Sequence, residues 1–336
     1  MSKDYSKLPE IFAKQKMLII GDAMLDIYLW GKVERISPEA PVPVVAVKRR
    51  DYSLGGAANV ALNLKALGVT PILCSVIGED QKALDFLNKM KQEQLPTDGI
   101  LKSSGRLTTS KFRIFGNSYQ MLRVDEESTH DLSTANESEM RDNIHSIIGK
   151  QQIDAIILQD YNKGVLTRHL INDIIELANQ KSIPVAVDPK KRNFREYKDV
   201  TLFKPNLKEL REGLKVDINL EQGWELEHAA NMLHSEQKVQ MVLATLSDAG
   251  VYISAVESGN QVKRYHIPAH LRSVSDVSGA GDTVISVATA CLAAGMTPWE
   301  IAAISNLAGG LVCEEVGVVP VNLNRLMEEI KEMGGE

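Results

Sequence analysis

The feature that most constrains the fold is an alternation of short apolar strands and amphipathic helices from about residue 153 onward. Strands are predicted at 153–158, 185–187, 202–204 and 242–245, and helices at 167–180 and 224–233. Thr167 is a suitable N-cap for the first of these helices. Uninterrupted apolar strands separated by helices are typical of a parallel sheet that is covered on both faces. The sequence therefore predicts an α/β fold with a doubly wound, mostly parallel sheet.

The N-terminal half adds a first strand, a helix and a second, smaller sheet. A strand is predicted at 17–20, and Gly55-Gly56 opens an apolar helix that Gly68 ends. Segment 108–124 alternates polar and apolar residues around a central Gly-Asn, which is typical of a hairpin. Together with extended stretches near 28–33 and 44–50, it predicts a β-sheet lid. The expected organisation is an N-terminal extension at 1–16 and one body at 17–336, with lid strands near 26–52 and 108–124.

Composition excludes several classes of function. The 336 residues include 38 Lys and Arg and 44 Asp and Glu, so the net charge of −6 gives no basic surface for nucleic acid. No apolar run reaches the ~20 residues that span a bilayer, and the N-terminus is too polar for a secretory signal. The three cysteines form no CxxC pair, which argues against a zinc site or a disulfide framework. We expect a cytoplasmic protein that binds neither nucleic acid nor membrane.

A glycine-rich turn at 276–283 (DVSGAGDT) precedes an apolar helix predicted at 284–294. Gly279 and Gly281 leave the backbone N–H groups unobstructed, and with Ala280 and the start of the helix they predict an anion hole. Asp282 lies beside this anion hole, where a carboxylate can take the proton of an attacking hydroxyl. We therefore predict that Asp282 is the catalytic base. The alternative is a glycine turn with an aspartate helix cap.

A second glycine pair, in the segment Gly55-Gly56-Ala-Ala-Asn59, also precedes a helix. Paired glycines allow a ligand to approach the backbone, and Asn59 offers both a donor and an acceptor. The alternative is a tight turn into a packed helix. No GxxxxGK[ST] motif occurs, and no GxGxxG follows the first strand, so a Walker-type nucleotide loop and a dinucleotide-dependent oxidoreductase are both disfavoured.

Occurring in this order, the two glycine motifs resemble those of the ribokinase-type, or PfkB, carbohydrate kinases, from about residue 17 to 320. The resemblance implies a parallel α/β body, a β-sheet lid, and magnesium-dependent phosphoryl transfer from ATP to a sugar hydroxyl. It implies substrate contacts at Asp22, Asp26, Gly55, Gly56 and Asn59. It also implies ATP contacts at Asn206, Thr245, Ser247, Gly250, Asn306 and Gly309, with Mg²⁺ held through water by Asn206 and Glu209. The alternative for Asn206 and Glu209 is a helix N-cap with its first-turn acid.

Other segments, above all RISPEAPVPV at 35–44, resemble the heptose kinases of lipopolysaccharide core synthesis within that family. This resemblance implies phosphorylation of D-glycero-β-D-manno-heptose 7-phosphate at its anomeric oxygen. Substrate contacts are then expected at Lys111, Arg113, Asp160, Lys163, Asp188 and Lys190. The alternative for the cations is solvated surface charge. No HxGH motif occurs, so an adenylyltransferase step is not predicted.

Two competing functions and one assembly complete the expectations. A kinase of the same family for another sugar or nucleoside would differ only in the loops around 35–44 and 160–192. A catalytically inactive sugar sensor would not need a base, so Asp282 with Gly279 and Gly281 argues against it. The open edges of the lid strands predict a homodimer formed through the lid.

Overall fold

The structure is a computed structural model that describes residues 5–220, 223–257, 259, 261–270 and 272–333. The strands of the main sheet in these residues are β1 (Lys16–Gly21), β4 (Thr70–Ile77), β5 (Ile100–Lys102), β8 (Ala155–Gln159), β9 (Val185–Asp188), β10 (Leu202–Phe203), β11 (Met241–Thr245), β12 (Val251–Val256) and β13 (Val262–Ile267). Their order in the sheet is β13-β12-β11-β10-β9-β8-β1-β4-β5. All neighbours from β11 to β5 pair in parallel, whereas β12 and β13 are antiparallel. The predicted doubly wound, mostly parallel sheet is thereby confirmed.

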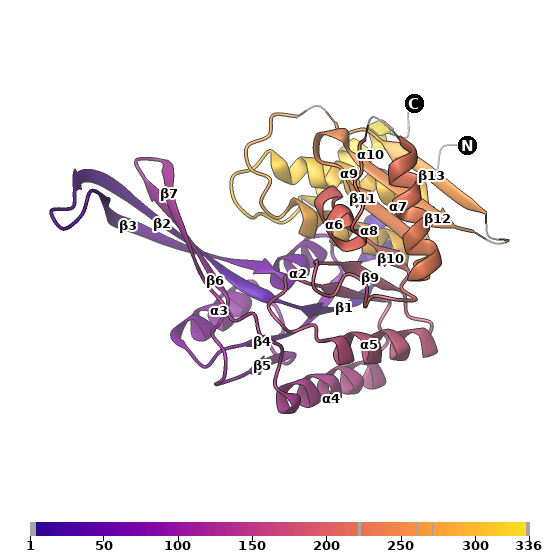
Figure 1. The fold of residues 1–336 in the computed structure, drawn as a ribbon, viewed down its shortest axis with the longest axis horizontal. Coiled ribbons are helices and arrows are strands. Elements are labelled where there is room, and N and C mark those ends of the chain that lie inside the picture. The colour runs from indigo at the N-terminus through magenta and orange to yellow at the C-terminus, as the bar shows by residue number, and fades with distance from the viewer. Residues whose placement is uncertain (1–4, 221–222, 258, 260, 271, 334–336) are drawn as a thin grey trace.

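Helices cover both faces of this sheet (Figure 1). One core includes side chains of α1 (Leu8–Phe12), α2 (Ala57–Ala66), α3 (Gln81–Gln92), α8 (Ala280–Ala293), α9 (Pro298–Cys313) and α10 (Leu323–Met333). The other includes α4 (Thr134–Lys150), α5 (Arg168–Gln180), α6 (Leu207–Leu214) and α7 (Gly223–Glu236). Met17 and Ile19 of β1 join the first core, and Leu18 and Ile20 join the second. This alternation explains why the strands are apolar throughout, since both faces are buried.

The lid is a separate four-stranded sheet that projects from the body (Figure 1). It consists of β2 (Ala23–Ile36), β3 (Pro43–Gly56), β6 (Ser110–Gly116) and β7 (Tyr119–Glu126), in the order β3-β2-β6-β7. The β6–β7 hairpin turns at Asn117 and Ser118, whose φ values of 53° and 71° fit a type I′ turn. The predicted hairpin is confirmed, with its turn one residue later than expected.

Two predicted boundaries differ from the structure. Leu8 and Phe12 of α1 are buried in the body, and the Tyr5 hydroxyl donates to Glu300 at 3.0 Å. Residues 5–15 are therefore part of the body rather than a separate extension, and residues 1–4 lie outside the described residues. The glycine-rich helix starts at Ala280, four residues before the predicted 284, because Gly279 already serves as its N-cap.

Cys74 and Cys291 are buried free thiols, and Cys313 is a half-buried one. Within the described segments, we find no helix with the length and apolar character needed to span a bilayer.

Candidate active site

The turn that is predicted to form an anion hole lies at the start of α8. Gly279 is the N-cap residue, and its φ of +84° lies in the left-handed region that favours glycine. A Cβ at this position would lie 3.0 Å from Asn59 Nδ2, so glycine is also needed for space. Among the described residues, the N–H groups of Gly281 and Asp282 meet no protein acceptor. These N–H groups, at the positive end of a 14-residue helix, are suited to bind an anion.

Asp282 follows this turn and is held by three donors. Its side chain is buried, and Asn59 Nδ2 donates to Oδ2 at 2.8 Å. The Tyr161 hydroxyl and Gln159 Nε2 donate to Oδ1 at 2.7 Å and 3.0 Å. Burial raises the pKa of Asp282 to about 6, although Asn59 and Tyr161 favour the charged form. A fixed carboxylate with a pKa just below neutrality has the properties of a general base.

Asn59 reaches Asp282 because of the glycine pair before α2. Gly56 is the N-cap of α2 with φ of +59°, and a Cβ there would lie 2.4 Å from the carbonyl oxygen of Asp22. A Cβ at Gly55 would lie 2.3 Å from Asp26 Oδ2. The close turn places Asn59 in the first turn of α2, fully buried beside α8. The second glycine motif thus positions Asn59 to donate to Asp282, the predicted base.

A charged network extends from Asp282 along the ends of β8, β9 and β10. Gln159 Nε2 also donates to Asp188 Oδ2 at 3.0 Å, and Lys204 Nζ lies 3.1 Å from the same oxygen. Lys190 forms an ion pair with Glu209. Burial alone would lower the pKa of Lys190, but the carboxylates of Asp188 and Glu209 raise it. Lys190 and Lys204 therefore supply fixed positive charge next to the anion hole.

A cavity of about 740 Å³ lies beside this network. It runs past the anion hole and includes all six residues expected to contact ATP, namely Asn206, Thr245, Ser247, Gly250, Asn306 and Gly309. Asp188, Lys190, Lys204 and Gly279–Asp282 (Gly279, Ala280, Gly281 and Asp282) also line it. A Cβ at Gly309 would lie 2.7 Å from the Val284 side chain, so glycine keeps α8 and α9 close at this wall. The cavity has the size of a cofactor or substrate site and opens at the carboxyl ends of parallel strands.

Asn206 and Glu209 form the capping box of α6. Asn206 Oδ1 accepts from the Glu209 N–H at 2.9 Å, and Glu209 Oε2 accepts from the Asn206 N–H at 2.8 Å. The cap interpretation of these residues is thereby confirmed. The described residues contain no group of three or more His, Cys, Asp or Glu side chains that could hold a metal ion directly. The buried Asp188 Oδ1 has no hydrogen-bond partner among the described residues, so this oxygen is available to water or a cation.

The lid contributes a cation next to Tyr161. Lys111 Nζ of β6 lies 5.7 Å from the centre of the Tyr161 ring, and Lys190 Nζ of the body lies 5.4 Å from it. Arg113 forms an ion pair with Asp26, and Lys163 lies 2.6 Å from Glu127 Oε2. Lys111 of the lid and Lys190 of the body are therefore brought together around Tyr161.

Two predicted substrate carboxylates support a loop instead of facing the Asp282 cluster. Asp22 is buried and accepts from the N–H groups of Tyr161, Lys163 and Val165 at 2.8, 3.0 and 3.1 Å. Burial raises its pKa, and those three N–H donors oppose the shift. Asp160 accepts from Asn162 N and, through its other oxygen, from the side chains of Asn193 and Tyr197. Burial and then the charge of Asp22 raise the pKa of Asp160 to about 6. Of the two aspartates after β1, Asp26 remains the candidate for a sugar contact.

Three residues of the site were missed from sequence: Gln159, Tyr161 and Lys204. Gln159 and Tyr161 flank the end of β8, and Lys204 follows β10 directly. Polar residues at the carboxyl ends of parallel strands are the signal that would have identified them. The fold and site together define a phosphoryl-transfer type of site, in which a base lies beside an anion hole at the strand ends.

Comparison with known proteins agrees with this class. Residues 14–324 match the pfkB family carbohydrate kinase, and the chain belongs to this family of ATP-dependent carbohydrate kinases. Bifunctional protein HldE of Magnetococcus marinus is 40% identical over 323 residues, which cover 94% of this chain and 64% of that protein. Bifunctional protein HldE of Syntrophotalea carbinolica is 38% identical over 313 residues, which cover 93% of this chain and 62% of that protein. The chain thus spans less than two thirds of the length of these relatives.

Solved structures show the same fold at low sequence identity. Phosphofructokinase-2 from Escherichia coli in complex with fructose-6-phosphate has a TM-score of 0.74 at 15% identity, covering 96% of this chain and 99% of that one. Arabidopsis thaliana ribokinase complexed with ribose and ATP has a TM-score of 0.69 at 16% identity, covering 94% and 99%. The ribokinase-like fold, with its body sheet and lid sheet, is confirmed.

Proposed function

We propose that the chain phosphorylates D-glycero-β-D-manno-heptose 7-phosphate at the anomeric hydroxyl, giving the 1,7-bisphosphate for ADP-heptose and lipopolysaccharide synthesis in the cytoplasm. The observation that carries the choice of an anionic sugar is Lys111. It is half-buried beside Tyr161 and forms no ion pair with a carboxylate among the described residues. Burial lowers the pKa of Lys111, so the nearby carboxylates do not fully offset the cost of burying its positive charge. The identity of 38–40% to HldE proteins supports the same choice.

The geometry supports a direct transfer to the sugar hydroxyl. Asp282 takes the proton of the sugar hydroxyl. The hydroxyl oxygen forms a bond to the γ-phosphorus of ATP, and the bond from that phosphorus to the ADP oxygen breaks. The N–H groups of Gly281 and Asp282 then face the transferring group, and Lys204 lies beside it on the cavity wall. Asn59, Gln159 and Tyr161 keep the carboxylate oriented throughout.

ATP and Mg²⁺ fit the residues that are present. The cavity takes a molecule of this size, and its glycine-lined end leaves room for phosphates. ATP supplies the phosphoryl group, and Mg²⁺ neutralises charge on its phosphates. Because the Asn206 and Glu209 side chains are engaged in the cap, they would hold the ion through water, with Asp188 Oδ1 as a further acceptor.

The test is a mass-resolved product assay with ATP, heptose 7-phosphate and a panel of unphosphorylated sugars and nucleosides. We expect one phosphate to be added to heptose 7-phosphate and little to the others. If another sugar or a nucleoside is the best acceptor, the heptose assignment is wrong and the alternative, a kinase of this family for that substrate, replaces it.

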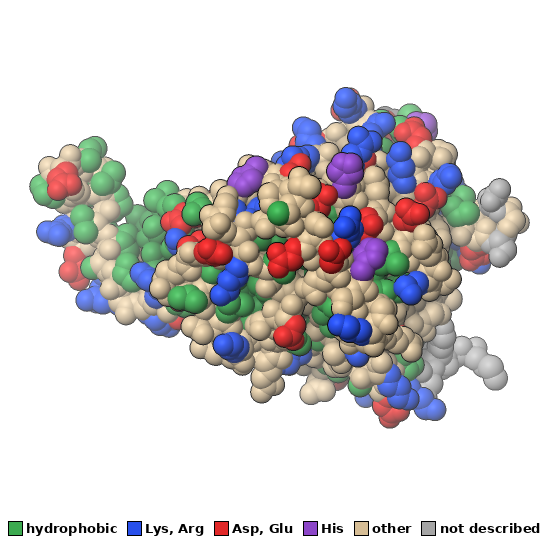
Figure 2. Space-filling view, turned by 90° about the horizontal axis from the view of Figure 1, so that it is seen from below, with side chains coloured by type: hydrophobic (Ala, Val, Ile, Leu, Met, Phe, Trp, Pro, Cys, Tyr) green, Lys and Arg blue, Asp and Glu red, His purple; other side chains and the backbone are tan. Residues whose placement is uncertain are grey.

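We further propose a homodimer formed through the lid. Its strands expose large apolar side chains, with exposed fractions of 62% for Ile36, 48% for Val47 and 56% for Leu122, and Figure 2 shows hydrophobic side chains along the projecting arm. A second copy would cover them and pair the open strand edges. Light scattering should give twice the chain mass at micromolar concentration, and Leu122→Asp should give the monomer. A monomer for the parent protein would contradict the proposal.

A further inference from the structure

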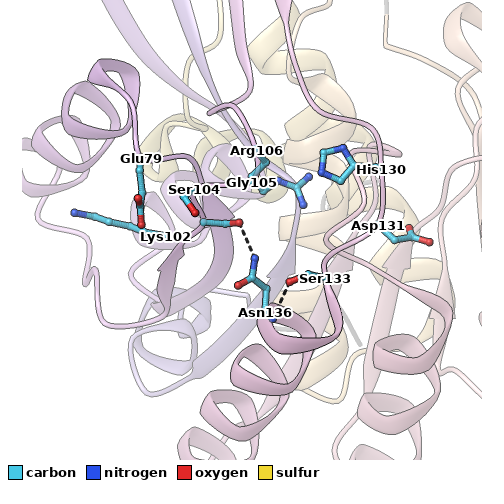
Figure 3. A pocket seen from close by; sticks show the side chains of 10 residues that line it. Glu79, Lys102, Ser104, Gly105, Arg106, His130, Asp131, Ser133 and Asn136 are labelled. Atoms are coloured by element: carbon cyan, nitrogen blue, oxygen red, sulfur yellow. Dashed lines mark hydrogen bonds between the residues drawn. The ribbon is translucent and has the colours of Figure 1, made fainter.

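A second cavity of about 430 Å³ lies outside the nucleotide cavity. It is formed by the loops after β4 and β5 and by the start of α4, and its lining includes Glu79, Lys102, Arg106, His130, Ser133 and Asn136 (Figure 3). Among the described residues, the two cavities have no lining residue in common. The kinase reaction proposed above gives this cavity no role.

Arg106 is the residue that points to a ligand. Only 8% of it is exposed, yet Nη1 is buried without a hydrogen-bond partner among the described residues. Its other terminal nitrogen, Nη2, donates to the carbonyl oxygen of Lys163. Burial lowers the pKa of Arg106, and the charges of Asp22 and Asp131 oppose the shift only in part. A buried guanidinium whose donors are not all used is costly, and the positive charge that Arg106 brings to the cavity lining favours an anion there.

The side chains around Arg106 favour an anion at one end of the cavity. Figure 3 shows the guanidinium group between Gly105 and His130, above the first turn of α4. Ser133 caps that 17-residue helix by accepting from the Asn136 N–H at 3.2 Å. The N–H groups of Thr134 and Ala135 meet no protein acceptor in the described part of the chain. The positive helix end therefore adds to the charge of Arg106.

Two carboxylates also line the cavity. Asp131 is engaged by Arg192, whose Nη2 donates to it at 2.9 Å. Glu79 is exposed and lies with Lys102 at the opposite end from His130 (Figure 3). The charges are therefore divided, with the Arg106 end positive and the Glu79 end mixed. A ligand with a phosphoryl group at one end and hydroxyls at the other matches this division.

We propose that this cavity is a second binding site, which takes the phosphoryl group of inorganic phosphate or of a small phosphate ester against Arg106. The bond from Arg106 to the Lys163 carbonyl connects it to the loop at 160–165, whose N–H groups bind Asp22. The site is thus separate from the nucleotide cavity but shares a loop with the kinase centre.

The test is calorimetric titration of inorganic phosphate, and in parallel of glycerol 3-phosphate, into the full chain at constant ionic strength. Saturable binding should weaken about tenfold or more in Arg106→Lys, because lysine lacks the guanidinium donors, and less in Lys102→Met, which removes a positive charge from the far end of the cavity. Lys91→Met is the matched control, since it removes an exposed lysine on α3 outside both cavities. It should bind like the parent. Tighter binding of glycerol 3-phosphate than of phosphate identifies an ester as the ligand class, and the reverse identifies the free ion.

Three results would overturn the proposal: no saturable binding, equal binding in the parent and in both cavity variants, or weakening only in Lys111→Met. The last would place the phosphate in the kinase centre and would leave the proposed kinase function intact. Because Arg106 is buried, its variant needs a thermal unfolding control. If it does not fold, Lys102→Met together with Ser104→Glu decides the question, since both side chains are exposed.

Discussion

The start of α8 and the lid both place a charged side chain next to Tyr161, but the two side chains are held very differently. Asp282 is 4% exposed and receives three hydrogen bonds from two segments of the chain, the first turn of α2 and the end of β8 with the residues after it. Lys111 Nζ on the lid lies 5.7 Å from the centre of the Tyr161 ring, and this side chain forms no ion pair with a carboxylate among the described residues. The chemistry is therefore fixed by the body, whereas the lid offers charges that a substrate must engage. We propose that the body sets the reaction and the lid sets the substrate.

Removing the base is the strongest way to break this comparison. Asp282→Asn should lower kcat by about 10²–10⁴-fold, the usual contribution of a general base, while KM changes little. The amide keeps the shape of the side chain, so the variant should fold. Asp248→Asn makes the same change at an exposed carboxylate of the same cavity and should leave kcat nearly unchanged. Steady-state kinetics that give both variants the activity of the parent would remove Asp282 as the base.

Tyr161 provides a second test of this comparison, because its hydroxyl donates a hydrogen bond to Asp282, the predicted base. Burial and the carboxylates of Asp282 and Asp188 raise its pKa well above the ordinary value, so the hydroxyl stays protonated and donates. Tyr161→Phe removes a donor that favours charged Asp282, so the pKa of Asp282 should rise above about 6. Activity is lost as pH falls through that pKa, so the acidic limb of the kcat/KM profile should move to higher pH by roughly one unit.

At pH 7 the same variant should lose about twofold in kcat/KM, because only about half of Asp282 would then be ionised, and most of the loss should be recovered at pH 8.5. A merely structural role for Tyr161 would lower activity equally at all pH values. An unmoved acidic limb is therefore the outcome that contradicts the assignment.

The smallest expected effect concerns Glu209. Glu209→Gln keeps an acceptor for the α6 cap but removes the charge proposed to act on Mg²⁺ through water, so the magnesium concentration for half-maximal rate should rise several-fold. Glu300→Gln is the matched control, because Glu300 occupies the same capping-box position on α9 outside the cavity lining. Equal magnesium titrations for the two variants would leave Glu209 with its capping role alone.

The sequence predicts the body sheet and the lid well, since these depend on local patterns of apolar residues and glycines, and the same kind of pattern marks the turn before Asp282. The role of Asp22 was not predictable in the same way. Its three donors lie about 140 residues away in the chain, and the sequence does not show whether a carboxylate after a strand meets a ligand or a loop. Asn59 is similar, because its contact with Asp282 spans 223 positions and depends on how α2 packs against α8. Roles that depend on such distant contacts need the structure.

The most direct test of the division between body and lid is the ratio of kcat/KM for heptose 7-phosphate to that for unphosphorylated heptose. A site that pairs a substrate phosphate with cations should give a ratio of about 30 to several thousand in the parent, corresponding to roughly 2–5 kcal/mol. Lys111→Met should reduce this ratio tenfold or more and leave the plain sugar within about threefold of the parent. Asp282→Asn should lower both values equally and keep the ratio. If Lys111→Met leaves the ratio unchanged, or if Asp282→Asn alters it as much as Lys111→Met does, the proposed division is wrong.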